Sequence, residues 1–311
     1  MKKYLFLMMS GFMVLVWKVS AQQIPVSSLF VENPFLFNPA VAGTDNGFKV
    51  RMDNRFQWIG FDDAPITNQL SAYGPHKTRN IGYGGNISYD ATGPTSTFKM
   101  NGAFATNFAI NLDIRVSLAL NLGLIQYRAD GTQFEFFDLY EDPKAPNTVM
   151  SSFQPDAGAG LYVYHYDWYV GLSAQQLFNN NVKFVKGEDS KRNRLKTHFY
   201  GLAGYKFYSS DKHWVIEPTI LLRKVVAVPV QMDLTGKVVF REQFWGGLNF
   251  RNTFESFNDV SVLLGYIHER RIHIGIAYDY SFSKIRNWTS GTVELVVGYN
   301  FDVHPSRIGR N

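Results

Sequence analysis

Residues 111–127 show a long, strict alternation of apolar and polar side chains. Charged, amide or small residues separate the aliphatic positions, which are Leu112, Ile114, Val116, Leu118, Leu120, Leu122 and Leu124. A period of two predicts a strand and excludes a helix, because alternate side chains share a face only in an extended chain. Strands of soluble proteins usually run about 5–6 residues. A longer aliphatic face, backed by a polar one, indicates a strand between lipid and a wet lumen.

Two segments near the C-terminus repeat this pattern. Residues 272–282 and 293–301 place aliphatic side chains in the middle of one face and aromatic side chains towards one end. A membrane strand has this distribution, because its centre meets hydrocarbon and its end meets headgroups. Marked in this way, the chain predicts fourteen strands, centred near residues 51, 70, 84, 101, 118, 160, 171, 201, 218, 233, 247, 262, 276 and 296. The predicted fold is therefore all-β, a transmembrane antiparallel β-barrel of about 14 strands.

The lengths of the predicted connections favour a barrel over a soluble β-sandwich. Every second connection is short, and the other set contains all the long ones, namely Trp58–Pro65, Ala129–Pro155, Gln176–Leu195 and Lys284–Gly291. Outer-membrane barrels sort their loops in this way, with the short turns facing the periplasm, whereas a sandwich has no reason to. Closure also removes the edges that such long strands would otherwise expose.

Four regions are expected along the chain. Residues 1–21 have the features of a secretory signal peptide, because two lysines precede an apolar run that ends in small residues. Residues 22–46 contain three prolines and suit an irregular segment that plugs the lumen. Residues 47–302 form the predicted outer-membrane barrel, and residues 303–311 form a short periplasmic tail.

The composition changes once the signal peptide is set aside. Its removal takes away three lysines, so 31 basic residues fall to 28 against 26 acidic ones, and the net charge of +5 falls to +2. The basicity therefore lies largely in the targeting segment and does not indicate a nucleic-acid partner. The exported chain has no cysteine and hence no disulfide framework. Aromatic residues are 16% of the chain although its mean hydropathy is −0.16, which suits strands with one apolar and one polar face.

The sequence offers no catalytic constellation. Seven histidines are scattered, and none stands at ligand spacing from a second one, so no metal site and no cofactor is predicted. The adjacent acids Asp62 and Asp63 are expected to be solvated rather than to bind Ca²⁺. The stretch Gly82-Tyr83-Gly84-Gly85 lies in a predicted strand with no helix after it, so phosphate binding is not expected. Its small residues suit a bend in the strand or entry of the N-terminal segment into the lumen.

Residues 179–196 carry six basic side chains against two acidic ones. A solvated outer loop is the simplest interpretation of this composition. The alternative is contact with lipopolysaccharide phosphates or with an acidic partner. Nucleic-acid binding is not expected, because no compact basic fold accompanies the run.

The hairpin between the first two predicted strands carries apolar side chains at its tip. Its loop contains Trp58, Ile59, Gly60, Phe61 and Pro65. If the first strand rises from the periplasm, this tip lies at the outer end of the barrel. The aromatic side chains then either anchor in the outer interface as a belt or form part of a surface for another protein. Both interpretations stay open at this point.

Several motifs occur together in an order that resembles a known family. Residues 37–43 (FNPAVAG), 55–61 (RFQWIGF), 64–67 (APIT), 82–85 (GYGG), 155–158 (PDAG) and 275–281 (GIAYDYS) are similar to the PorP/SprF family of type IX secretion proteins in Bacteroidota. The likeness runs through nearly the whole mature chain. Its motif residues are candidates for partner binding: Asn38, Pro39, Gly43, Arg55, Gln57, Trp58, Gly60, Phe61 and Pro65.

The resemblance implies an outer-membrane barrel, not an enzyme, that supports secretion or cell-surface attachment of cargo proteins, gliding adhesins among them. The implied partners are other type IX secretion components, the secreted surface proteins, and outer-membrane lipid or lipopolysaccharide. One departure concerns the last strand, where Thr292-Val293-Glu294-Leu295 replaces the expected Ser-His-Glu-Ile. The alternation survives, so the fold is unaffected, but the subfamily and the cargo are put in doubt.

The tripeptide Asn38-Pro39-Ala40 suggests an alternative. FadL-like transporters are similar fourteen-stranded barrels whose N-terminal plug carries an Asn-Pro-Ala motif. A transporter of small apolar molecules is therefore the second hypothesis, and a non-specific porin is the third. Apolar pockets lining the lumen would favour FadL-like transport, and an open charged eyelet would favour a porin. A plugged lumen with an aromatic protein-binding face would favour the secretion hypothesis.

Overall fold

The computed structural model describes residues 26–133, 148–182, 194–226, 228–253 and 256–301. The expected signal peptide (1–21) and periplasmic tail (303–311) lie outside the described residues, as does the centre of the basic loop (183–193). These three interpretations stay predictions.

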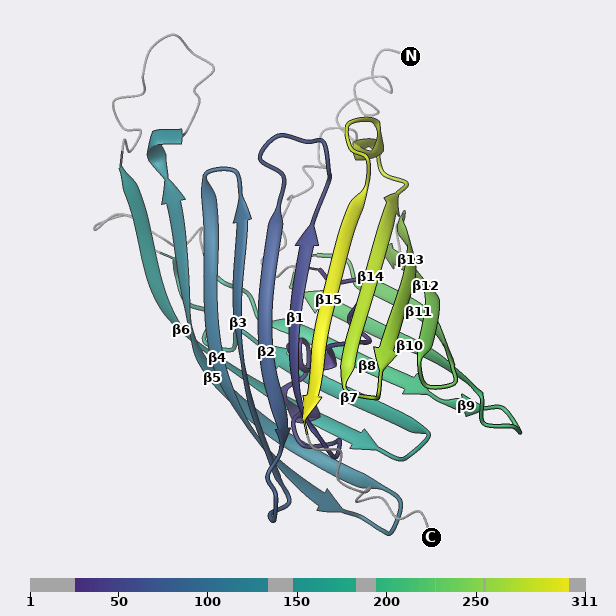
Figure 1. Cartoon of the computed structure of the whole chain (residues 1–311). Coiled ribbons are helices and arrows are strands. Elements are labelled where there is room, and N and C mark those ends of the chain that lie inside the picture. Colours follow the sequence, from purple (N-terminus) through teal and green to yellow (C-terminus); the bar gives the residue numbers. More distant parts are fainter. Residues whose placement is uncertain (1–25, 134–147, 183–193, 227, 254–255, 302–311) are drawn as a thin grey trace, which may run out of the picture.

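Antiparallel strands make up nearly all the regular structure of the described residues (Figure 1). Each predicted strand centre falls within one of the strands. Four 3-10 helices accompany them: η1 (Pro34–Leu36), η2 (Pro39–Val41), η3 (Gly131–Gln133) and η5 (Lys284–Asn287). The strands are β1 (Phe48–Phe56), β2 (Ile66–Pro75), β3 (Ile81–Thr92), β4 (Thr95–Ala109), β5 (Arg115–Asp130), β6 (Val149–Tyr164), β7 (Trp168–Gln175), β8 (His198–Tyr205), β9 (Phe207–Tyr208), β10 (Trp214–Val225), β11 (Gln231–Phe240), β12 (Phe244–Thr253), β13 (Ser256–His268), β14 (Ile272–Ser281) and β15 (Thr292–Phe301).

The short element β9 continues β8 rather than forming a separate membrane strand. Both pair with β10 in one register, since Gly204 lies opposite Thr219 and Phe207 lies opposite Ile216. The ladder is interrupted between these pairs, where Pro218 has no N–H to donate. Counted as one strand, β8–β9 brings the total in the described residues to fourteen, which confirms the prediction.

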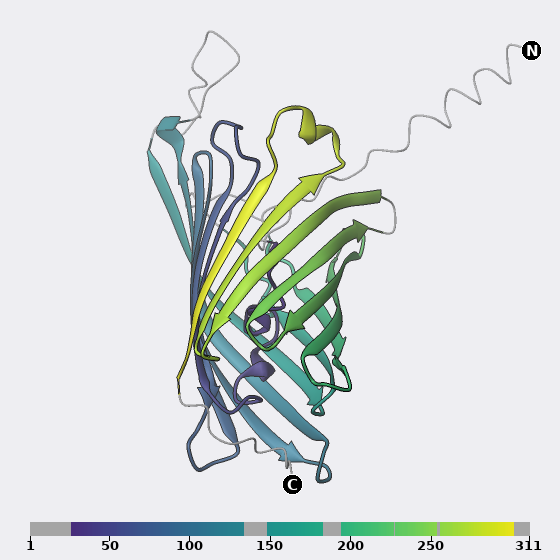
Figure 2. The ribbon, with the colours of Figure 1, turned by 45° about the vertical axis from the view of Figure 1, so that its right-hand side comes forward.

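The sheet closes into a barrel. The first strand pairs with the last along its full length, from Phe48 opposite Phe301 to Phe56 opposite Val293. On the far side β10 pairs with β11, so every strand has a neighbour on both sides (Figure 2). Closure lets the strands satisfy one another's backbone hydrogen-bonding groups, as a hydrocarbon environment requires. No helix in the described part of the chain is long and apolar enough to cross a bilayer.

The connections sort by length between the two ends of the barrel, as predicted. With β8–β9 counted as one strand, the connections are numbered in chain order. The long ones are the first, fifth, seventh and thirteenth, at residues 57–65, 131–148, 176–197 and 282–291, and all of them have odd numbers. No even-numbered connection exceeds five residues. In Figure 1 the connections from β1 to β2, from β3 to β4 and from β14 to β15 lie at the upper end, and those from β2 to β3 and from β4 to β5 lie at the lower end. These are called below the long-loop end and the short-turn end.

Burial along β5 confirms its two faces. Leu118 is 47% exposed on the outer surface, whereas its neighbour Ser117 is fully buried in the lumen. The prediction was wrong about where the strand starts. Leu112 lies in the preceding turn and is 92% exposed, because the Asn111 side chain accepts hydrogen bonds from the backbone of Asp113 and Ile114 and forms a local turn. The alternation therefore continues beyond the end of the strand.

Aromatic side chains gather at both ends of the outer surface. At the short-turn end the rings of Trp214 and Phe240 lie 4.4 Å apart, and those of Phe244 and Tyr266 lie 5.1 Å apart. At the long-loop end Phe282 packs against an aromatic side chain of β13 at 5.0 Å. Aliphatic side chains occupy the outer face between these two girdles. The arrangement matches the hydrocarbon core and the two interfaces of a bilayer.

The girdles predict how the cost of a buried charge depends on depth. Ile276 and Ile272 lie on the same outer face of β14, the first between the girdles and the second beside the short turn at residues 269–271. We expect Ile276→Arg to lower the free energy of unfolding by about 2–4 kcal/mol, and Ile272→Arg by about 0–1 kcal/mol. Denaturant titration of the barrel refolded in lipid measures both. Equal losses would contradict the assigned membrane position.

Candidate functional site

The N-terminal segment, residues 26–47, runs inside the barrel and is called the plug below (Figure 2). It contains η1 and η2 but no strand, as expected for an irregular segment. Its apolar side chains are among the most buried of the described residues: Leu29, Phe30, Phe35, Phe37, Ala40, Val41 and Ala42. The plug therefore occupies much of the lumen of the described barrel, in the part of the chain where the sequence led us to expect an irregular segment.

Asn38 fixes the middle of the plug. Its side-chain oxygen accepts a hydrogen bond from the Ala40 N–H at 3.0 Å and so caps η2. Its side-chain nitrogen donates to the carbonyl oxygen of Leu161 at 3.0 Å. The barrel wall leaves space for this amide by using glycine, since a Cβ on Gly160 would lie 2.2 Å from the Asn38 oxygen and one on Gly171 would lie 2.7 Å from its nitrogen. The Asn-Pro-Ala motif thus holds the plug in a fixed position against the barrel wall.

The glycine-rich stretch of β3 leaves space for the end of the plug. A Cβ on Gly82 would lie 2.1 Å from the carbonyl oxygen of Ala42, and one on Gly84 would lie 2.9 Å from the ring of Phe35. Gly43 itself has a φ of +78°, a conformation that favours glycine. Of the two roles that the sequence suggested for these small residues, a bend in the strand or entry of the N-terminal segment, these contacts support the second.

Aromatic packing fills the lumen around η1. The Phe35 ring stacks on Tyr73 of β2 at 4.6 Å. Phe37 makes edge contacts with Phe30 at 6.4 Å and with Tyr200 of β8 at 5.6 Å. Aromatic pairs of this kind contribute about 0.5–1.5 kcal/mol beyond the area they bury. The plug thereby supplies the hydrophobic core of a barrel whose inner wall is largely polar.

A buried ion cluster holds the first residues of the plug. Arg55 donates to Glu294 and to Asp279, both at 2.7 Å, and all three side chains are at least nine-tenths buried. The backbone N–H of Ser28 donates to Glu294 at 2.9 Å, and its hydroxyl donates to Asp279 at 2.8 Å. Charge-assisted hydrogen bonds are stronger than neutral ones, so the carboxylates bind the plug and the arginine together.

A second arginine extends this cluster around the barrel. Arg251 of β12 donates to the Ser28 hydroxyl at 2.9 Å and to Asp233 of β11 at 2.8 Å. Asp233 also pairs with Arg223 of β10. The plug is consequently tied to a continuous run of strands on the side where β10, β11 and β12 meet.

Glu32 anchors the plug further along. Its carboxylate pairs with Lys237 of β11 and lies 3.5 Å from the ring of His273 of β14. Burial alone would raise the pKa of Glu32, but the nearby Lys237 and His273 lower it below its ordinary value. The carboxyl group is therefore ionised at neutral pH, and its lysine partner is buried with it. Asn33, the next residue, donates to Asp53 of β1 at 2.7 Å.

The structure divides the sequence-predicted residues between two places. Asn38, Pro39 and Gly43 belong to the plug, and Arg55 lies in the lumen, so none of these presents a side chain on the outer surface. The other predicted residues lie in the loop between β1 and β2: Gln57, Trp58, Gly60, Phe61 and Pro65. Some of the predicted residues therefore hold the plug in place, and the others form a loop at the barrel mouth.

The loop after β1 is fastened to the loop after β14. The Ile59 N–H donates to the carbonyl oxygen of Gly291, and the Ser290 N–H donates to the carbonyl oxygen of Ile59, both at 2.8 Å. Trp58 has a positive φ of 53°, donates its N–H to Thr292, and lines a cavity of about 200 Å³ at the mouth together with lumen residues. Trp58 is thus one of the residues that line this cavity.

The exposed side chains at this mouth are apolar. Phe61 is 49% exposed and Ile59 is 41% exposed. Trp288, just after η5 in the neighbouring loop, is 74% exposed. Sequence reasoning missed Trp288 because nothing in its local pattern sets it beside the first hairpin. It also missed the partners Glu32, Asp279 and Glu294, whose inward-facing positions were visible in the alternation but whose pairing was not.

The described residues contain no cluster of three or more side chains able to hold a metal ion. Among the buried carboxylates of the described residues, Glu32, Asp233, Asp279 and Glu294 are paired with arginine or lysine, whereas Asp53 accepts a hydrogen bond from Asn33 of the plug. What this site does chemically is to hold a peptide segment in place.

The close contact at Gly160 predicts a way to disturb the plug. Gly160→Ala places a methyl group against the Asn38 amide, so we expect the plug to shift and the single-channel conductance in planar bilayers to rise. Gly102→Ala is the matched control, because a Cβ there meets nothing within 4 Å. If both variants conducted like the unmodified barrel, the plug would not depend on this contact.

The Glu32–Lys237 pair predicts a stability effect. Glu32→Gln leaves a buried lysine without its partner, and we expect a loss of about 3–5 kcal/mol in the free energy of unfolding. Glu242→Gln removes the partner of Arg270 in an exposed pair at the short-turn end, and we expect a change of about 0–1 kcal/mol. Denaturant titration compares the two. A small effect of Glu32→Gln would show that the plug does not depend on this ion pair.

Several outer-membrane proteins of known structure are similar to this chain. The chain is similar to the CymD monoaromatic hydrocarbon channel, with a TM-score of 0.52 and 11% identity over 90% of this chain and 95% of that one. It is also similar to the outer membrane protein Omp33 of Acinetobacter baumannii, with a TM-score of 0.49 and 8% identity over 83% of this chain and 100% of that one. A FadL homologue of Pseudomonas aeruginosa matches with a TM-score of 0.44 and 9% identity, over 83% of this chain and 89% of that one.

Identities this low relate the folds alone, and a search of curated proteins gives no match. The family comparison is more specific. Residues 19–299 match the model described as type IX secretion system membrane protein PorP/SprF. Because this match spans most of the sequence, including the plug and the described strands, the chain belongs to the PorP/SprF family of type IX secretion system membrane proteins.

Proposed function

We propose that this outer-membrane protein holds cargo proteins at the cell surface through its long-loop end, as a component of the type IX secretion system. The observation that carries the proposal is the pairing of a filled lumen with exposed apolar side chains at one mouth. Phe61 and Trp288 stand on two loops that are hydrogen-bonded to each other through Ile59. Large aromatic side chains of this kind are the usual anchors of protein interfaces.

The filled lumen favours attachment over transport. A passage for solutes requires a continuous path, whereas Asn38, Glu32 and Ser28 fix the plug to strands on different sides of the barrel. The family is one of membrane barrel components and not of enzymes. The FadL-like alternative requires an apolar binding pocket in the lumen, but the cavity at the long-loop mouth is lined mainly by polar and charged side chains.

The proposal requires the long-loop end to face outwards. Asn287 in η5 is exposed at that end, and Lys212 is exposed in the turn before β10 at the other. We expect an impermeant thiol reagent to label Asn287→Cys but not Lys212→Cys in intact cells. The chain has no cysteine of its own, so each label reports one position. Labelling of Lys212→Cys alone would reverse the orientation.

The apolar surface predicts a loss of display without a loss of the barrel. We expect Phe61→Ala combined with Trp288→Ala to leave a heat-modifiable barrel in the outer membrane and to reduce surface display of cargo, because interface aromatics commonly carry about 2 kcal/mol or more each. Phe282→Ala is the control, since Phe282 is an exposed aromatic of the lipid-facing girdle. Display is measured by antibody labelling of intact cells.

Deletion of the gene separates the competing functions. We expect deletion to abolish display of the cargo and to leave uptake of long-chain fatty acids unchanged. Normal display combined with impaired uptake of an apolar nutrient would establish the FadL-like alternative and refute the proposal.

A further inference from the structure

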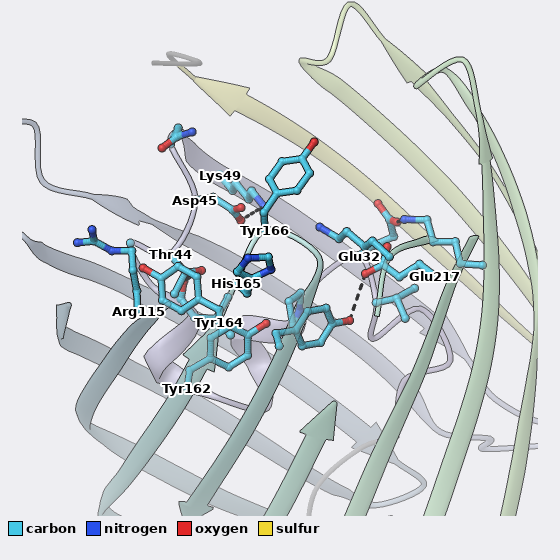
Figure 3. A pocket seen from close by; sticks show the side chains of 18 of the residues that line it. Glu32, Thr44, Asp45, Lys49, Arg115, Tyr162, Tyr164, His165, Tyr166 and Glu217 are labelled. Atoms are coloured by element: carbon cyan, nitrogen blue, oxygen red, sulfur yellow. Dashed lines mark hydrogen bonds and ion pairs between the residues drawn. The ribbon is translucent and has the colours of Figure 1, made fainter. Parts of the chain in front are cut away.

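A second cavity of about 460 Å³ opens at the short-turn end, opposite the proposed cargo surface (Figure 3). Its volume is in the range of small-ligand sites. Turn residues His165 and Tyr166 line its entrance, and plug residues Val31, Pro34 and Val41 close it from inside. The cavity is therefore a blind pocket, suited to holding a ligand and not to passing one.

One buried arginine of this cavity, Arg51, has no ion pair within the described part of the chain. Arg51 of β1 is 2% exposed, yet no carboxylate of the described residues lies within ion-pair distance of it. Its guanidinium donates instead to neutral oxygens, at 3.0 Å to Val50, 3.3 Å to the Glu32 carbonyl and 2.8 Å to the Asn300 side chain. Asp45 and Asp53 act on this guanidinium only from beyond ion-pair distance, so it is a buried cation that a bound carboxylate would pair directly.

The wall is built around this guanidinium. A Cβ on Gly298 of β15 would lie 2.6 Å from Arg51, so glycine there leaves the space that the arginine occupies. Two further cations line the cavity without an ion pair to any described residue, Arg115 at the start of β5 and Lys206 after β8. They stand on different walls. Lys49 and Lys237, by contrast, are already paired with Asp45 and Glu32.

Tyrosines form much of the remaining wall. Tyr162 stacks with Tyr169 at 5.7 Å, and Tyr166 at the entrance stacks with Tyr208 at 5.5 Å. The Tyr169 hydroxyl is bound to Glu217 at 3.2 Å, which keeps that carboxylate occupied. Figure 3 shows Tyr162, Tyr164 and Tyr166 between Arg115 on one side and Glu217 on the other. Such a wall offers aromatic faces and hydroxyl groups beside the positively charged side chains of the cavity.

We propose that this cavity is a binding site for an acidic peptide segment of a partner protein. The carboxylates meet Arg51 within the cavity and Arg115 and Lys206 at its walls, and the tyrosines contact the peptide backbone and any aromatic side chain. With the orientation proposed above, the partner is periplasmic. The binding itself does not depend on that orientation or on cargo attachment.

The test uses the purified full-length barrel in detergent and two synthetic probes, acetyl-Asp-Tyr-Glu with a free C-terminus and the neutral acetyl-Asn-Tyr-Gln amide. Isothermal titration at low salt should show binding of the acidic probe alone. Arg115→Gln with Lys206→Gln should weaken it at least tenfold. Lys212→Gln, a charge removed from an exposed turn at the same end, should leave it unchanged.

Arg51→Gln should weaken binding of the acidic probe more than the Arg115→Gln, Lys206→Gln variant does. An unfolding titration of the Arg51→Gln variant shows whether its barrel has remained intact. Equal binding of the neutral probe would overturn the proposal, as would an unchanged affinity in the Arg115→Gln, Lys206→Gln variant. Displacement of the acidic probe by an equal concentration of inorganic phosphate would also overturn it, because the site would then bind simple anions without recognising a peptide.

Discussion

Hydrocarbon leaves no partner for a backbone N–H or carbonyl group except another part of the protein, and this constraint shapes the whole molecule. It forces the sheet to close, as β1 does on β15. Barrels of about eight strands fill their interior with their own side chains, but fourteen strands enclose more space than one layer of side chains occupies. That space is left to water in porins or is occupied by a separate segment, and here the plug occupies much of it.

The ion pairs inside the lumen are better understood as positioning devices than as sources of stability. The free energy lost by removing Arg55, Asp279 and Glu294 from water offsets much of the free energy gained from their mutual attraction. Their geometry, however, is met by one occupant, since Ser28 offers a backbone N–H to Glu294 and a hydroxyl to Asp279. An apolar lumen would accept the plug in many registers, whereas these carboxylates accept one.

The sequence was sufficient to predict the strands, because a residue's alternation depends only on its nearest neighbours and on the face that meets lipid. It was also sufficient for the plug, which prolines and a position before the first strand indicate. It was not sufficient for the contacts. Arg55 and Glu294 are 239 positions apart and meet because the barrel closes, and the loop that carries Trp288 reaches the first hairpin for the same reason. Such pairings depend on the register of every intervening strand.

The plug also relates the two ends of the barrel to each other. Ser28 binds the cluster that includes Arg55, near the mouth that carries Trp58, whereas the carbonyl oxygen of Glu32 accepts from Arg51 in the wall of the opposite cavity. The five residues from Ser28 to Glu32 thus connect the cluster near one mouth with the wall of the opposite cavity. A ligand on Arg51 competes with that carbonyl oxygen for the same guanidinium, so its binding energy acts directly on an anchor of the plug. If the proposed acidic peptide binds Arg51, this competition would link the short-turn cavity to the position of the plug.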